Sequence, residues 1–75
     1  MQPYKNSGGD SGVSAFEIGD DYVKVQFKEG SLYLYNNSSA GSQNIQIMKS
    51  LAINGEGLNS FINTHVREKY ASKLR

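Results

Sequence analysis

Three short segments in the first half of the chain alternate between apolar and polar residues. They span residues 14–18, 22–27 and 31–35, and alternation with a period of two is typical of half-buried β-strands. Only residues 19–21 and 28–30 separate them, and both connections are rich in turn-forming residues. Because connections this short join antiparallel neighbours, the pattern predicts a three-stranded antiparallel meander.

The second connection determines which side chains share a face. A glycine in third place, after two residues that favour the right-handed helical region, suits a three-residue hairpin loop with a bulge at Gly30. A two-residue turn would move every side chain to the other face, but it requires Glu29 at positive φ, which is disfavoured. The first register therefore predicts that the two tyrosines of the third segment face the core, in the pairs Val25–Tyr33 and Val23–Tyr35.

Two later segments carry apolar residues at helical spacing. The first covers residues 43–52, with Ser42 as the expected N-cap. The second begins at Leu58, and its apolar stripe continues as far as Tyr70. Residues 54–57, with two glycines, separate the helices. The predicted fold is α+β, in the order β-β-β-α-α, with both helices packed on one face of the sheet.

The N-terminal residues have a different composition. Residues 1–12 are rich in Gly, Ser, Asn and Asp, and such a segment buries too little apolar surface to offset its ordering entropy. We predict a disordered arm over residues 1–12 and a single domain over residues 13–75. The chain has no cysteine, no signal-like apolar segment and no apolar run near the roughly 18 residues of a membrane span. These features predict a soluble cytoplasmic protein without membrane association.

Catalytic and metal-binding patterns are sparse. The one histidine, His65, lies at the edge of the last apolar stripe, without a second histidine or carboxylates at metal-ligand spacing. Residues 55–57 precede a helix but lack the Lys-Ser/Thr pair of a phosphate-binding loop. We therefore expect no enzymatic activity, no metal and no cofactor.

Charge and tyrosine content leave two kinds of binding open. The net charge is +1, yet four cations fall in the last nine residues; such a cluster contacts phosphates or simply suits the negative end of a helix dipole. The five tyrosines can stack on unpaired bases or fill a small core. The predicted register favours the core role for Tyr33 and Tyr35.

Residues 23–35 resemble the centre of the KTSC domain, whose hallmark is a Tyr-x-Tyr after a hairpin glycine, matched here by Tyr33 and Tyr35. Residues 61–63 and 66–70 resemble its closing segment, which ends in a tyrosine matched by Tyr70. The likeness covers roughly residues 13–72. This chain departs from the family where a Val-Pro often follows the last strand and where a Ser-Lys-Gly often joins the helices.

The KTSC domain occurs at the C-terminus of some lysyl-tRNA synthetases and as small stand-alone bacterial proteins. The resemblance implies a structural role for the motif tyrosines and weak binding of tRNA-like RNA. Our leading interpretation is a non-catalytic accessory module that binds RNA through the basic C-terminal helix, with contacts from Asn63, Arg67, Lys69, Lys73 and Arg75. Two helices cover only one sheet face, so the alternative is a protein-interaction or homodimerisation module. Its contact surface would be the uncovered face with Tyr22, Leu32 and Leu34.

Overall fold

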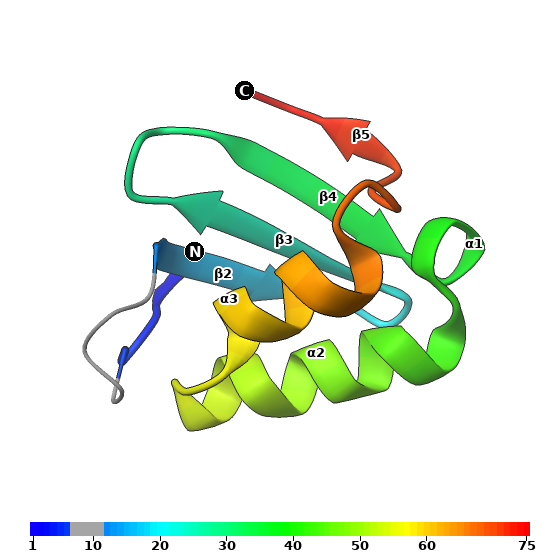
Figure 1. Ribbon diagram of the computed structural model, residues 1–75, viewed down its shortest axis with the longest axis horizontal. Coiled ribbons are helices and arrows are strands. Elements are labelled where there is room, and N and C mark those ends of the chain that lie inside the picture. The colour runs from blue at the N-terminus through cyan, green and yellow to red at the C-terminus, as the bar shows by residue number, and fades with distance from the viewer. Residues whose placement is uncertain (7–11) are drawn as a thin grey trace.

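The computed structural model describes residues 1–6 and 12–75, which form an antiparallel sheet with helices on one face (Figure 1). The predicted α+β class, with strands followed by helices, is confirmed. The described residues form five strands in chain order, two more than predicted. The strands are β1 (Gln2–Pro3), β2 (Val13–Ile18), β3 (Tyr22–Phe27), β4 (Leu32–Asn36) and β5 (Ser72–Lys73). The three predicted strands are β2, β3 and β4, and the chain's two ends add a short strand at each edge.

The hairpin of β3 and β4 has the predicted register. Residues 28–30 connect the strands, and Gly30 has φ 110°, a conformation that residues with a Cβ atom rarely adopt. The inner-face residues oppose one another in the pairs Val23–Tyr35 and Val25–Tyr33. Both valines are fully buried, and Tyr35 is 1% exposed. The three-residue loop therefore places the tyrosines on the helix side of the sheet.

Helix α2 (Ser42–Asn54) buries the predicted apolar stripe. Its buried residues are Ile45, Met48 and Ala52. The predicted N-cap was wrong, because Gly41 occupies that position without a side-chain hydrogen bond. The preceding link contains a short helix, α1 (Asn37–Ala40), which begins with a capping box between Asn36 and Ser39.

The last predicted helix is shorter than its apolar stripe suggested. Helix α3 (Leu58–Phe61) continues as a π-helix, η1 (Ile62–Val66), and the helical segment ends there. The chain then turns back to the sheet, where the N–H of Ala71 donates to the carbonyl of Leu34 at 2.6 Å. The prediction of a helix reaching Tyr70 was therefore wrong. The stripe is correct within the helix itself, where the buried residues are Leu58, Ile62 and Val66.

The predicted disordered arm, residues 1–12, was wrong where the structure describes its first six residues. Strand β1 pairs with β2, and Tyr4 belongs to the core with 7% of its surface exposed. The Tyr4 ring meets Phe16 edge to face at 6.5 Å between centroids, and its hydroxyl accepts a hydrogen bond from the N–H of Leu58 at 3.2 Å. Residues 7–11 of the predicted arm lie outside the described residues.

Tyr4→Ala should lower the free energy of unfolding by about 3 kcal/mol, because it removes a buried ring and the acceptor for a buried N–H. Urea denaturation followed by circular dichroism measures this loss. Gln2→Ala, at an exposed position of the same segment, is the control and should unfold near the wild-type midpoint. A Tyr4→Ala midpoint equal to that of the control would show that the N-terminal segment does not stabilise the fold.

Candidate functional site

A pocket of about 350 Å³ opens beside the first residues of η1, between β4 and the turn that leads to β5. One part of its lining is apolar and mostly aromatic, made by Phe27, Tyr33, Tyr35, Ile62 and Tyr70. The other part is polar and charged, made by Glu29, Asn63, Arg67 and Glu68. We call it the aromatic pocket. This lining suits a planar group that carries polar substituents along its edge.

Most ring pairs of the aromatic pocket meet at steep angles, and among the described pairs of the pocket only Tyr33 and Tyr35 are inclined by as little as 38°. Tyr33 lies 4.8 Å from Tyr70 between ring centroids, with 54° between their planes. Phe27 contacts Tyr33 edge to face at 5.8 Å, and Tyr35 contacts Tyr70 in the same way at 6.4 Å. Such edge-to-face pairs are a favoured aromatic geometry. These rings line the pocket on different sides and form its floor and walls.

The three motif tyrosines differ in exposure. Tyr35 is 1% exposed and Tyr33 is half-buried, whereas Tyr70 is 37% exposed at the outer wall. Burial raises the pKa of the Tyr35 hydroxyl to about 12, with smaller contributions from Tyr33 and Tyr70. Tyr35 is therefore a core residue that also forms the pocket floor, and Tyr33 and Tyr70 present more of their rings to a ligand.

Strand β5 places a cation beside the aromatic pocket. Its Lys73 pairs with Tyr33 across the β4–β5 ladder, and the Lys73 ammonium lies 5.7 Å from the centroid of the Tyr33 ring. This distance is within the range of a cation–π interaction. The pairing of β5 with β4 therefore brings a positive charge to the ring of Tyr33, which contacts both Phe27 and Tyr70.

Two of the three charged groups of the lining have no partner among the residues that the structure describes. Neither Arg67 nor Glu68 has a side-chain hydrogen bond or ion pair among the described residues. Arg67 therefore forms no ion pair with a carboxylate in this part of the chain. The Glu29 carboxylate accepts from the N–H of Ser31 at 3.0 Å. Hydrogen bonding from Ser31, first from its side chain and then from its backbone, holds the pKa of Glu29 below its ordinary value, aided by the charge of Lys73.

The residues predicted to bind RNA divide into two groups. Asn63 and Arg67 line the aromatic pocket and Lys73 lies beside it. Lys69 and Arg75 are exposed and do not line it. Their expected place on a C-terminal helix was wrong, because the helical segment ends at residue 66 and the rest of the chain forms a turn and β5.

Two acidic residues of the lining were missed by the sequence reasoning. Glu29 lies in the loop between β3 and β4. Phe27 and Tyr33 lie next to this loop on the inner face, so the predicted register could have indicated that Glu29 is near them. No pattern in the sequence indicated that Glu68 would line the pocket. Its position depends on where the helical segment ends, which the apolar stripe did not indicate.

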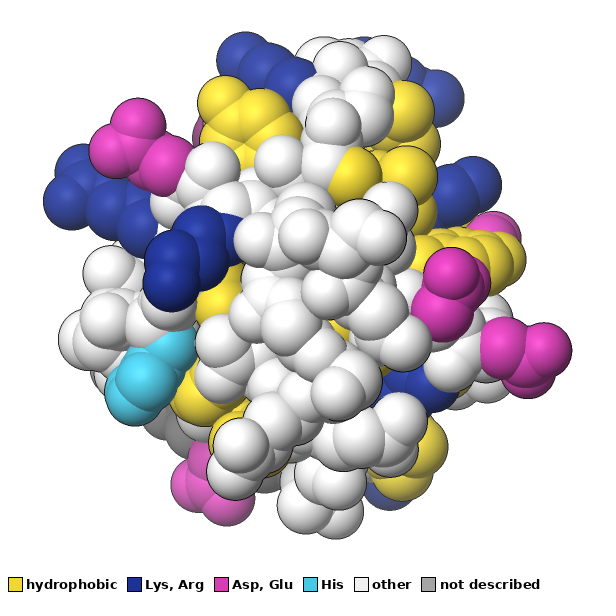
Figure 2. Space-filling view, turned by 90° about the vertical axis from the view of Figure 1, so that its right-hand side faces the viewer, with side chains coloured by type: hydrophobic (Ala, Val, Ile, Leu, Met, Phe, Trp, Pro, Cys, Tyr) yellow, Lys and Arg dark blue, Asp and Glu magenta, His cyan; other side chains and the backbone are white. Residues whose placement is uncertain are grey.

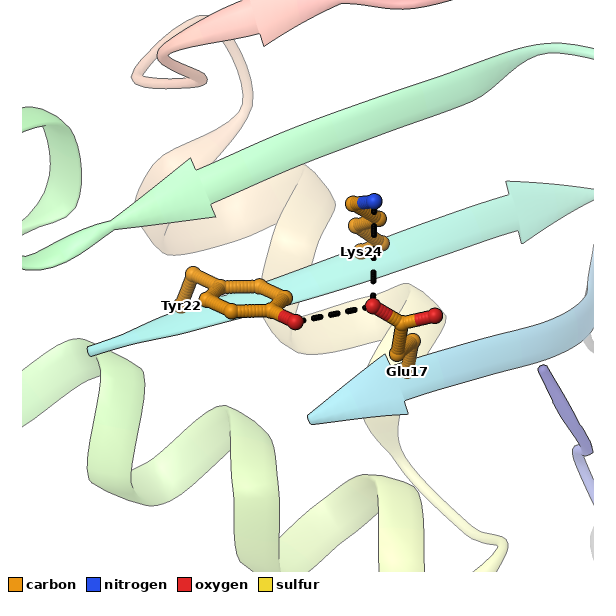
Figure 3. Close-up of polar contacts among 3 residues, drawn as sticks. All are labelled: Glu17, Tyr22 and Lys24. Atoms are coloured by element: carbon orange, nitrogen blue, oxygen red, sulfur yellow. Dashed lines mark hydrogen bonds and ion pairs between the residues drawn. The ribbon is translucent and has the colours of Figure 1, made fainter. Parts of the chain in front are cut away.

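The uncovered sheet face is less apolar than the sequence suggested. Figure 3 shows Tyr22 and Lys24 in front of β3, with the helical segment of α3 and η1 behind the strand. The Tyr22 hydroxyl donates to the Glu17 carboxylate at 2.8 Å, and the Lys24 ammonium lies 3.7 Å from the same oxygen. The three residues proposed for this face are only half-exposed: Tyr22, Leu32 and Leu34. A polar network therefore interrupts the expected apolar patch.

No protein-family model, curated protein or solved structure matched this chain. The resemblance to the KTSC domain therefore rests on its motif residues alone. Within residues 1–6 and 12–75, no group of three or more His, Asp or Glu residues is placed to hold a metal ion. The helices in the same part of the chain are too short or too polar to cross a membrane.

The raised pKa of Tyr35 predicts a loss of stability at high pH. Below pH 10, the hydroxyl is protonated in the folded and the unfolded state. Above the ordinary value of about 10, the unfolded state releases this proton, whereas the folded state keeps it up to about pH 12. The free energy of unfolding should therefore fall between pH 10 and 12.

Urea denaturation of the wild type and Tyr35→Phe over this pH range isolates the effect. The wild type should lose more stability than the variant, because phenylalanine keeps the buried ring but cannot ionise. Parallel losses in both proteins would contradict the pKa shift.

Proposed function

We propose that this chain is a non-catalytic binding module that holds one unpaired base of a single-stranded RNA in the aromatic pocket. One observation carries the proposal. The pocket brings three tyrosine rings together with Asn63 and Arg67, and Lys73 lies beside it. Rings and cations that are separated in the sequence thus form one concave surface.

The aromatic part of the lining suits a nucleobase. A base is planar, and stacking on an aromatic side chain contributes about 1–3 kcal/mol for each base. Tyr33 and Tyr70 are the two tyrosines of the pocket that are not buried, and they belong to different segments of the chain. A base inserted beside them would gain contacts from β4 and from the C-terminal turn together.

The cations around the pocket suit the phosphates that flank such a base. Lys73 lies next to Tyr33, and Lys69 is exposed in the turn that follows η1. The attraction is modest, because acidic groups lie among the basic ones. On the side of the molecule shown in Figure 2, Lys and Arg side chains stand beside Asp and Glu and form no continuous basic surface. Binding on the order of 10⁻⁴ to 10⁻⁶ M is the expectation for mostly non-specific contacts.

The surroundings of the histidine support a non-catalytic role. His65 stacks on Phe61 with 4.5 Å between centroids and 10° between ring planes. Its Nδ1 lies 2.8 Å from the hydroxyl oxygen of Thr64. The His65 side chain is exposed and is not part of the pocket lining. A general base would instead need to reach the bound ligand.

The outer sheet face supports a second candidate function, in which it binds a protein partner or a second copy of the chain. The helices lie on the opposite face (Figure 1), and a shallow hollow of about 360 Å³ lies on the outer face. Tyr22, Lys24 and Leu34 are among the residues that line it. The internal network of Glu17 and its partners makes this surface less apolar than a typical docking site.

An amide-shift titration with a five-nucleotide RNA at low salt tests the first proposal. The shifts should concentrate at the aromatic pocket, and Tyr70→Ala should weaken binding about fivefold or more, the loss expected from one stacking contact. Tyr22→Ala, which removes a tyrosine from the opposite face, is the matched control and should bind like the wild type. Two phosphate contacts, from Lys69 and Lys73, predict a log–log salt slope of about −1.4, or about sevenfold weaker binding at 200 mM than at 50 mM salt.

An unperturbed amide spectrum at millimolar RNA and low salt would contradict RNA binding. Shifts confined to the outer face would favour the second candidate. Equal losses in Tyr70→Ala and Tyr22→Ala would show that the aromatic pocket does not hold the base.

A further inference from the structure

We infer that the aromatic pocket selects guanine over the other bases, an inference that rests on the proposed function. The lining contains features that phosphate binding does not explain. Two carboxylates, Glu29 and Glu68, line the same pocket as Arg67. A carboxylate repels phosphate, so carboxylates in this position suit a ligand that presents N–H groups.

Arg67 and Glu68 are well suited to recognise one planar ligand. They are consecutive in the chain, both line the pocket, and neither has a side-chain partner among the residues that the structure describes. Ionised carboxylates only accept hydrogen bonds, and guanidinium groups only donate them. The pair therefore presents one donor group and one acceptor group to a ligand that lies against the rings.

Guanine is the base whose edges match this pair. Its O6 and N7 atoms both accept, which is the arrangement that an arginine contacts in a bidentate manner. Its N1–H and 2-amino groups are adjacent donors, which suit a carboxylate on the Watson–Crick edge. Adenine and cytosine place a ring nitrogen acceptor beside their amino group, and uracil has one N–H between two carbonyls. A carboxylate in the pocket would therefore meet a lone pair on each of these bases.

Glu68 is the carboxylate to which we assign this contact. One oxygen of Glu29 already accepts from the N–H of Ser31, whereas Glu68 has no such bond among the described residues. In the inferred complex, Arg67 contacts O6 and N7, Glu68 contacts N1–H and the 2-amino group, and the base lies against Tyr33 and Tyr70. Hydrogen bonds to ionised groups are the stronger ones, so both contacts contribute to the selection.

The test compares five pentanucleotides of sequence UUNUU, in which N is guanosine, inosine, adenosine, cytidine or uridine. Fluorescence anisotropy of labelled RNA at low salt gives the dissociation constants. The guanosine oligonucleotide should bind about tenfold tighter than the uridine one, within the discrimination expected for a bidentate contact. Inosine, which lacks the 2-amino group, should bind more weakly than guanosine.

Glu68→Gln separates base recognition from simple repulsion. The variant should weaken the guanosine oligonucleotide and abolish its advantage over inosine, while uridine binding stays unchanged or improves because a negative charge is removed. Glu56→Gln, at an exposed residue outside the pocket lining, makes the same charge change and should keep the preference for guanosine. Amide spectra of both variants check that the fold is retained.

The outcomes distinguish the two proposals. Equal binding of all five oligonucleotides, or a preference for another base, would overturn guanine selection and leave RNA binding intact. Equal strengthening of every oligonucleotide by Glu68→Gln would also overturn it, since Glu68 would then act by charge alone. If no oligonucleotide binds, both proposals fail.

Discussion

The register between β3 and β4 is the constraint on which the rest of the structure depends. It places Tyr35 opposite Val23 and Tyr33 opposite Val25, so both tyrosines face the helices. A slip of one residue would move every β4 side chain to the other face. Leu34 would then lie under the helices, and the aromatic pocket would lose its floor. The three-residue loop ending at Gly30 specifies the fold and the candidate site together.

The C-terminal turn is the second requirement for the pocket. The helical segment ends at Val66, and the following residues cross to the outer edge of β4. This crossing brings Arg67 and Tyr70 to the tyrosines of β4, and Lys73 to the ring of Tyr33. If the helix had continued along its apolar stripe, the Tyr70 ring would have packed against the sheet like the other apolar residues of the helix. The early end of the helix therefore creates a concave surface where the stripe predicts a filled interface.

Periodic patterns predicted the parts of the fold that are themselves periodic. The three central strands and the buried positions of the two main helical segments followed from repeated apolar spacing, and the register of β3 and β4 followed from the loop that ends at Gly30. Strands β1 and β5 have two residues each and thus no period to detect. Tyr4 was missed because it is one aromatic residue in a polar segment, and its stabilising partner, the N–H of Leu58, is 54 positions away. Most residues of the candidate site were noticed individually, but their proximity depends on β5, which no pattern indicated.

The two short outer strands have a consequence for how copies of this chain meet one another. An exposed sheet edge is a template for intermolecular pairing, and proteins block it with very short strands, proline and lysine. Here one edge carries Pro3, which has no N–H to donate, and the other carries Lys73. Each outer strand offers too few free backbone groups to support a further strand. Extension of the sheet into an aggregate would first require one of the two outer strands to dissociate from its neighbour, and capture of an extended peptide along β4 would require β5 to dissociate.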